Sequence, residues 1–140
     1  MPIEDNKVIA HRLIREFSNE KKLKVVDELF TEDFVNHSPC PGYASDREGL
    51  KKFITVFHSA FPDMITTIDD LITEENKVVI RMTGRGIHTG DLMGIPPTGK
   101  QVCVTSISII SIVDGKVAER WNITDILSLL QQLGVFPSMG

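Results

Sequence analysis

Apolar residues in the first part of the chain recur at the spacing of amphipathic helices. In residues 5–18, Ile9, Leu13 and Phe17 are four positions apart and fall on one helix face. Residues 23–30 show a shorter version of the same pattern. We therefore expect two N-terminal helices, each with one face directed at a core.

A third helix is indicated further along the chain. Ser45 is followed three residues later by Glu48, the pattern of a capping box, in which each side chain satisfies a free amide at a helix start. An apolar stripe then continues to Phe61, and Pro62 disfavours helical geometry in the residue before it. Residues 31–43 contain two prolines and a glycine, so we expect them to be irregular or briefly extended.

Beyond residue 63 the pattern is typical of strands. Four runs rich in Val, Ile and Thr predict strands at 64–73, 77–88, 101–113 and 116–123. Asp114-Gly115 lies between the last two runs and indicates a tight hairpin turn. Residues 89–100 are rich in glycine and proline and predict a loop, whereas residues 125–133 predict a short helix that ends at Gly134.

Helices followed by strands define the α+β class, and the chain length of 140 residues fits one domain over 1–140. We expect about three N-terminal helices to pack on one face of a curved, mainly antiparallel sheet. This arrangement forms a cone with a pocket between helices and sheet.

Composition narrows the class of partner. There are 15 Lys and Arg against 19 Asp and Glu, which gives a net charge of −4, and no block of basic residues favours nucleic acid. No apolar run approaches the length of a membrane-spanning helix, and the N-terminus lacks the pattern of a signal peptide. We therefore expect a cytoplasmic protein with no membrane partner, in which Cys40 and Cys103 are reduced and no Cys or His cluster forms a metal site.

The loop and its surroundings resemble a known family. The run GIHTGDLMGIPPTGK at 86–100 is similar to the corresponding loop of the SnoaL-like polyketide cyclases. Further matches, in the family's order, are DFVNH at 33–37, FPD at 61–63, VDGK at 113–116 and LLQQLG at 129–134. The resemblance implies a cone of the nuclear-transport-factor-2-like superfamily, a homodimer formed through the sheet, and ring closure on a polyketide by intramolecular aldol condensation without a metal or organic cofactor.

The resemblance also implies where the acid/base residue belongs. In the studied cyclases it is an Asp on the last long strand, and alignment on the VDGK run places that position at Asn122. A neutral amide exchanges hydrogen bonds but does not take a proton at neutral pH. The residue expected to carry the reaction therefore lacks its charge.

Strand alternation suggests which side chains share a face with Asn122. Arg120 lies two positions earlier on the same strand, and the resemblance places Ser106 and Ser108 of the preceding strand on the cavity side. These residues would form a polar wall with one cation, able to hold an anionic or carbonyl-bearing ligand. The alternative is that Arg120 and Asn122 lie on a solvated strand face.

Two histidines are candidates to replace the missing base. Asn36 is implied as a ligand contact, and the neighbouring His37 has a side chain that titrates near neutral pH. His88 enters the loop at 89–100 and could reach the cavity mouth. The alternatives are that His37 caps a turn and that His88 anchors the loop, whereas Asp125, the carboxylate closest to Asn122 in sequence, is a natural N-cap of the last helix.

Three functions fit the sequence. The first is an enzyme of the cyclase or isomerase type that acts on a small hydrophobic carbonyl compound by proton transfer, with His37 or His88 in place of the Asp. The second is a binding module that keeps the pocket without the chemistry, and the third is a dimerising adaptor for another protein.

Overall fold

The computed structural model describes residues 3–136. Residues 1–2 and 137–140, which the predicted domain over 1–140 includes, lie outside the described residues. No helix in the described range is long and apolar enough to cross a membrane.

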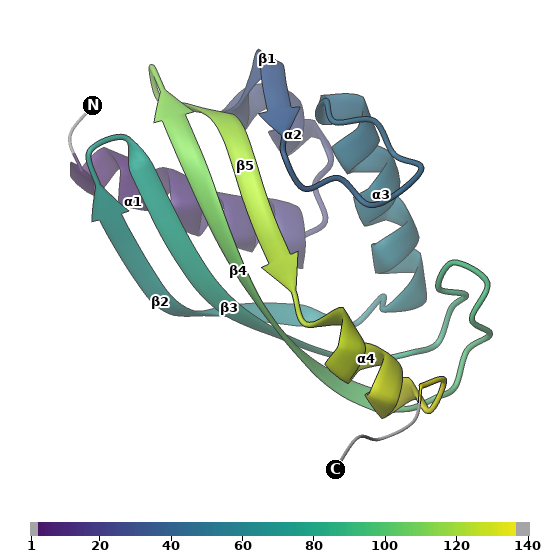
Figure 1. The fold of residues 1–140 in the computed structure, drawn as a ribbon. Helices are drawn as coiled ribbons and strands as arrows, with labels where there is room; N and C mark the ends of the chain where they lie inside the picture. Colours follow the sequence, from purple (N-terminus) through teal and green to yellow (C-terminus); the bar gives the residue numbers. More distant parts are fainter. Residues whose placement is uncertain (1–2, 137–140) are drawn as a thin grey trace.

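Five strands form one curved sheet in the order β1-β5-β4-β3-β2 (Figure 1). The strands are β1 (Phe30–Asn36), β2 (Ile65–Glu74), β3 (Lys77–Ile87), β4 (Gln101–Val113) and β5 (Lys116–Thr124). β2 to β5 pair antiparallel in sequence order, whereas β1 pairs parallel with β5. The sheet is thus mixed and mainly antiparallel, and the predicted α+β class is confirmed.

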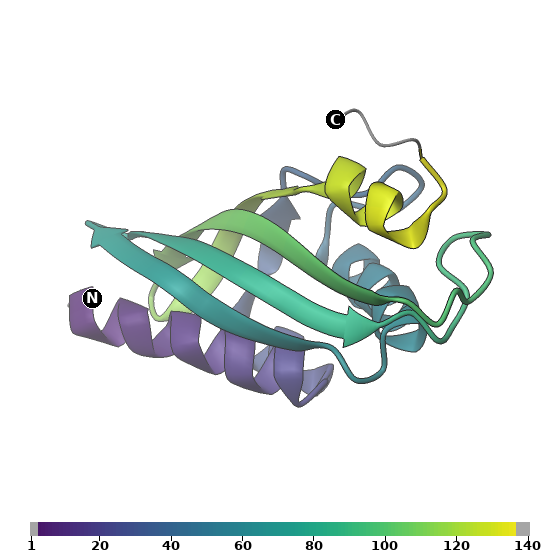
Figure 2. The same ribbon diagram turned by 90° about the horizontal axis from the view of Figure 1, so that it is seen from below.

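The helices lie on the sheet in two groups. α1 (Ile3–Arg12) continues as a π-helical segment (Leu13–Asn19), and α2 (Lys24–Leu29) and α3 (Arg47–Ala60) follow. Buried side chains of these helices share one core with Ile80 and Ile110 of the sheet, and α1 runs along one sheet face in Figure 2. α4 (Ile126–Leu133) packs with the C-terminal end of α3 in a second core, which includes Phe61 and Leu129.

The local signals for turns and caps mostly hold. Asp114 and Gly115 have φ values of 50° and 77°, as a type I′ turn requires, and they join β4 to β5. Asp125 caps α4 by accepting a 3.1 Å hydrogen bond from the Ser128 amide, and Gly134 ends the helix at φ 80°.

The predicted cap of α3 is wrong by one residue. Asp46, not Ser45, accepts the hydrogen bond from the Gly49 amide, at 2.9 Å. Ser45 is held by the preceding segment instead, because its carbonyl accepts a 2.7 Å bond from the Asn36 amide. The same bond ties the 37–45 loop to β1. Of the segment 31–43, expected to be irregular or briefly extended, residues 31–36 are extended as part of β1 and the rest is loop.

Candidate functional site

The β4–β5 pairing puts a row of polar side chains on the inner face of the sheet. Ser108 lies opposite Asn122, Ser106 opposite Thr124, and Ile110 opposite Arg120. Residues opposite one another in an antiparallel pair project from the same face. Because Ile110 belongs to the core beneath the helices, the whole row faces the helical layer.

Two connected hollows lie between this face and the helices. The outer one has a volume of about 240 Å³ and lies between β5, α3 and the 37–45 loop. The inner one, of about 80 Å³, is lined mainly by apolar side chains of the π-helical segment, β3 and β4. Leu50, Phe53 and Arg120 border both, so together they form one cavity that opens beside the loop.

Asn122 is held in place by three hydrogen bonds. Its Oδ1 accepts from the Ser108 hydroxyl at 2.5 Å, and its Nδ2 donates to Thr124 Oγ1 at 3.0 Å. Its backbone amide donates to Ser38 Oγ at 3.0 Å. These contacts fix the amide within the cavity wall, where it can orient a ligand but cannot act as a base.

Asn36 lies beside Arg120 in the parallel β1–β5 pair. It is buried at the cavity wall, and its side-chain oxygen accepts a 3.0 Å bond from the Ser38 amide. Asn36 therefore shapes the start of the 37–45 loop as well as facing the cavity.

Arg120 is the cation of the cavity. No acidic side chain among the described residues pairs with its guanidinium, although Arg12, Arg47 and Arg81 each have a carboxylate within 4 Å. Its side chain keeps partial access to solvent through the cavity, but protein surrounds it, and this burial lowers the pKa of Arg120 to about 10. The guanidinium remains charged at neutral pH and has no internal counter-ion.

The structure places His37 on the outer face of the sheet. Its ring stacks on Trp121 with centroids 4.6 Å apart, and its Nε2 lies 3.2 Å from Glu119 Oε1. His37 does not border either part of the cavity.

His88 is fully buried at the base of the 89–100 loop, also outside the cavity lining. Its Nδ1 accepts a 3.2 Å bond from the Thr98 amide, and its backbone exchanges hydrogen bonds with Gly99 and Lys100. Accepting at Nδ1 requires the neutral ring with the proton on Nε2. This geometry is that of a residue that anchors the loop.

Ser106 is separated from the cavity despite facing the same side as Ser108. It borders a neighbouring hollow of about 630 Å³ together with Ile107 and Leu127. Thr124 and Ile126 border both spaces, so this hollow begins at the rim of the cavity.

Sequence reasoning missed the residues that the loop contributes. Cys40 and Tyr43 border the outer hollow, and the Tyr43 ring makes an edge contact with Phe53 at a centroid distance of 5.5 Å. A lone aromatic residue after a Pro-Cys-Pro-Gly run was the available signal, but no periodicity fixes where a loop side chain points.

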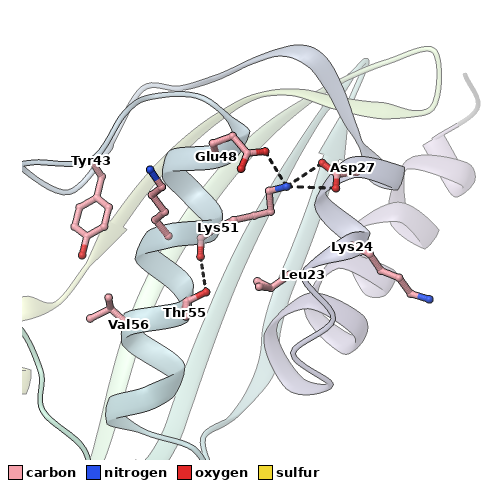
Figure 3. A pocket seen from close by; sticks show the side chains of 9 residues that line it. Leu23, Lys24, Asp27, Tyr43, Glu48, Lys51, Thr55 and Val56 are labelled. Carbon is pink, nitrogen blue, oxygen red and sulfur yellow. Dashed lines mark hydrogen bonds and ion pairs between the residues drawn. The ribbon is translucent and has the colours of Figure 1, made fainter.

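A further hollow is an open groove between α2 and α3 on the outside of the helical layer (Figure 3). Its volume is about 660 Å³, and Leu23 and Val56 supply apolar surface. Lys51 crosses it to pair with Glu48 at 2.8 Å and Asp27 at 3.2 Å. Lys24 and Lys52 also line the groove, and both are exposed, so its remaining cations are solvated, unlike Arg120 in the cavity. The described residues also contain no group of three His, Cys, Asp or Glu placed to hold a metal ion.

Comparison with known proteins agrees with this architecture. The family model described as SnoaL-like polyketide cyclase matches residues 8–133. Aklanonic acid methyl ester cyclase DauD from Streptomyces sp. (strain C5) is 35% identical over 133 residues, which cover 90% of this chain and 80% of DauD.

Two solved structures show how closely the fold is shared. AclR from Streptomyces galilaeus, a candidate hydroxylase, superposes with a TM-score of 0.89 at 26% identity and covers 99% of this chain and 91% of its own. IdmH from Streptomyces antibioticus, a candidate polyketide cyclase, has a TM-score of 0.82 at 33% identity, covering 93% and 99%. With the family model matching most of its length, the chain belongs to the SnoaL-like polyketide cyclases.

Proposed function

We propose that the cavity binds a small hydrophobic molecule with a carbonyl group and promotes its aldol cyclisation or isomerisation. The observation that carries the proposal is the polar wall with Arg120 and Asn122, which lies beside the mainly apolar inner part of the cavity. Apolar walls desolvate the ligand, and a fixed cation stabilises negative charge that develops on its oxygen. The 35% identity to a cyclase over 90% of the chain supports the same reaction class.

The proposed reaction assigns oxyanion stabilisation to the protein. Water at the open cavity mouth takes the proton next to the carbonyl, and the resulting enolate oxygen pairs with Arg120. The enolate carbon then attacks a second carbonyl of the same molecule, which forms the new carbon–carbon bond, and the alkoxide regains a proton from water. Asn122, which we propose stands where the family carries its acid/base Asp, orients the ligand through the amide that Ser108 and Thr124 hold in place.

A binding module without chemistry is the second candidate function. No described carboxylate or imidazole lines the cavity, and this observation favours binding without catalysis. His37, His88 and Asp125 each have another structural partner outside the cavity.

The two functions are separated by measuring turnover and binding together. Two substrates are used. Heptane-2,6-dione closes to a cyclohexenone by intramolecular aldol condensation, and aklanonic acid methyl ester is the compound named in the description of DauD. The enzyme proposal predicts product formation above background that Arg120→Met abolishes and that Asn122→Asp raises. Binding of both compounds without product, in the wild type and in Asn122→Asp, would establish the binding module instead.

We also propose that the protein is a homodimer formed through the outer face of the sheet. Pairing between strands gathers Ile107, Ile109, Trp121 and Ile123 on that face, and Ile123 is 78% exposed. Light scattering should give twice the monomer mass for the wild type and the monomer mass for Ile123→Lys. A folded wild-type monomer would favour the adaptor, because this apolar face would then be open to another protein.

We place the protein in the cytoplasm, with no nucleic-acid or membrane partner. The net charge of −4 and the two free thiols support this assignment.

A further inference from the structure

We infer that the cavity selects ligands that already carry a negative charge on oxygen, as a carboxylate or an enolate, and that Arg120 is the residue that selects them. The inference rests on the proposed function, since it takes the cavity between sheet and helices as the ligand site. It adds the charge state of the ligand, which neither the family nor the relatives' names specify.

The first observation is the position of Arg120. It borders both the outer and the inner part of the cavity, together with Leu50 and Phe53. A ligand that occupies both parts of the cavity therefore lies next to the guanidinium. The inner part is lined by Phe17, Ile80 and Ile110 and suits the hydrocarbon portion of the ligand.

The second observation is the missing counter-ion. Within the described residues, no carboxylate lies within ion-pair distance of Arg120, whereas Arg12, Arg15, Arg47 and Arg81 each have one. The nearby polar side chains Asn36, Ser108 and Asn122 are neutral, and each of them has a hydrogen-bond partner of its own. A charge taken out of water without a partner is unfavourable, so the site is arranged for a charge supplied from outside.

The pKa of the guanidinium is compatible with this role. Although burial lowers the pKa of Arg120 to about 10, the group stays charged across the neutral range. Hydrogen bonds between two ionised groups are about twice as strong as those between neutral groups, and Arg presents a planar pair of donors to a carboxylate or enolate.

An anionic ligand also accounts for the lining of the cavity. A 1,3-dicarbonyl compound that arrives as its enolate has already lost the proton that a side-chain base would remove. The described lining, which has no carboxylate or imidazole, is then sufficient to hold the reactive form.

The test compares anionic and neutral ligands of matched shape by isothermal titration calorimetry at pH 7.5. One pair is dimedone, an enolate at this pH, against 3,3-dimethylcyclohexanone. The other is 2-naphthoate against methyl 2-naphthoate. The proteins are the wild type, Arg120→Met, and Arg85→Met as a control at an exposed arginine outside the cavity lining.

We expect the wild type and Arg85→Met to bind the anion of at least one pair about ten-fold more tightly than its neutral partner, and Arg120→Met to lose this preference. The pair that shows the preference identifies the source of the charge as enolate or carboxylate. Equal affinity for anion and neutral analogue would overturn the inference and leave the proposed function standing. A preference that persists in folded Arg120→Met would overturn the role of Arg120, and absence of binding by all four compounds would overturn the proposed function itself.

Discussion

Replacing Arg120 with Met should make the free protein more stable. Methionine keeps the length and apolar stem of the side chain but removes a charge that lies in the cavity without a carboxylate partner among the described residues. Most substitutions of buried residues destabilise a protein, but here the residue removed is a cation that we propose is stabilised only by a bound ligand. In the ligand-free protein, the cation stabilises nothing and remains partly desolvated.

The pKa of Arg120 supplies the magnitude. Burial lowers the pKa of the guanidinium from its ordinary value to about 10, and a difference of that size corresponds to about 3 kcal/mol against the charged form. Because the side chain keeps some access to water through the cavity, we expect Arg120→Met to gain about 1 to 2 kcal/mol. The cost is present in full below the lowered pKa of about 10 and shrinks as the pH rises above it, because the folded chain then loses its proton before the unfolded chain does.

Urea unfolding at pH 7.5, followed by circular dichroism, measures this effect. Arg120→Met should unfold at a higher urea concentration with an unchanged slope, and the exposed control Arg85→Met should stay within about 0.5 kcal/mol of the wild type. If Arg120→Met were less stable than the wild type by about 1 kcal/mol or more, Arg120 would have a stabilising partner inside the fold, contrary to this prediction.

Three further predictions concern residues outside the cavity lining. Gly90→Ala places a Cβ 2.1 Å from the Ser59 carbonyl oxygen, so it should lower the free energy of unfolding by about 2 kcal/mol or more in urea titration; an unchanged value would show that the 89–100 loop moves freely. Asp125→Ala should cost about 1 kcal/mol through loss of the α4 cap, and Asp125→Asn should restore most of it with turnover unchanged; a loss of turnover in both would indicate a catalytic carboxylate instead. Burial, together with the charge of Lys21, lowers the pKa of His58, so the free energy of unfolding should fall as the pH drops from 6.5 through that lowered pKa. His58→Gln should flatten this dependence of stability on pH. Identical pH dependence in the two proteins would contradict the prediction.

The fold could be predicted because its signals are local. Apolar periodicity in α1 and α3, the Asp114-Gly115 turn and the Asp125 cap each depend on residues close in sequence. The cap of α3 was harder, because a long-range bond from Asn36 holds the Ser45 carbonyl and leaves Asp46 to cap the helix.

The polar wall of the site could be predicted from the sequence for the same reason, since alternation along β5 puts Arg120 and Asn122 on one face. The positions of the two histidines could not be predicted in this way. His37 follows directly after β1 and turns to the outer face, where Trp121 offers a stacking surface, and His88 turns inward beneath its own loop to meet Thr98. Neither orientation produces a periodic pattern in the sequence, because each depends on a partner that only the folded sheet brings close.

Ligands are proposed to bind between the sheet and the helices, against Arg120. The most direct measurement is a crystal structure of the protein soaked with dimedone. We expect a dimedone oxygen within about 3.2 Å of the Arg120 guanidinium, with its hydrocarbon ring toward Phe53. Dimedone found instead in the groove between α2 and α3, with the cavity beside Asn122 filled by water, would contradict it.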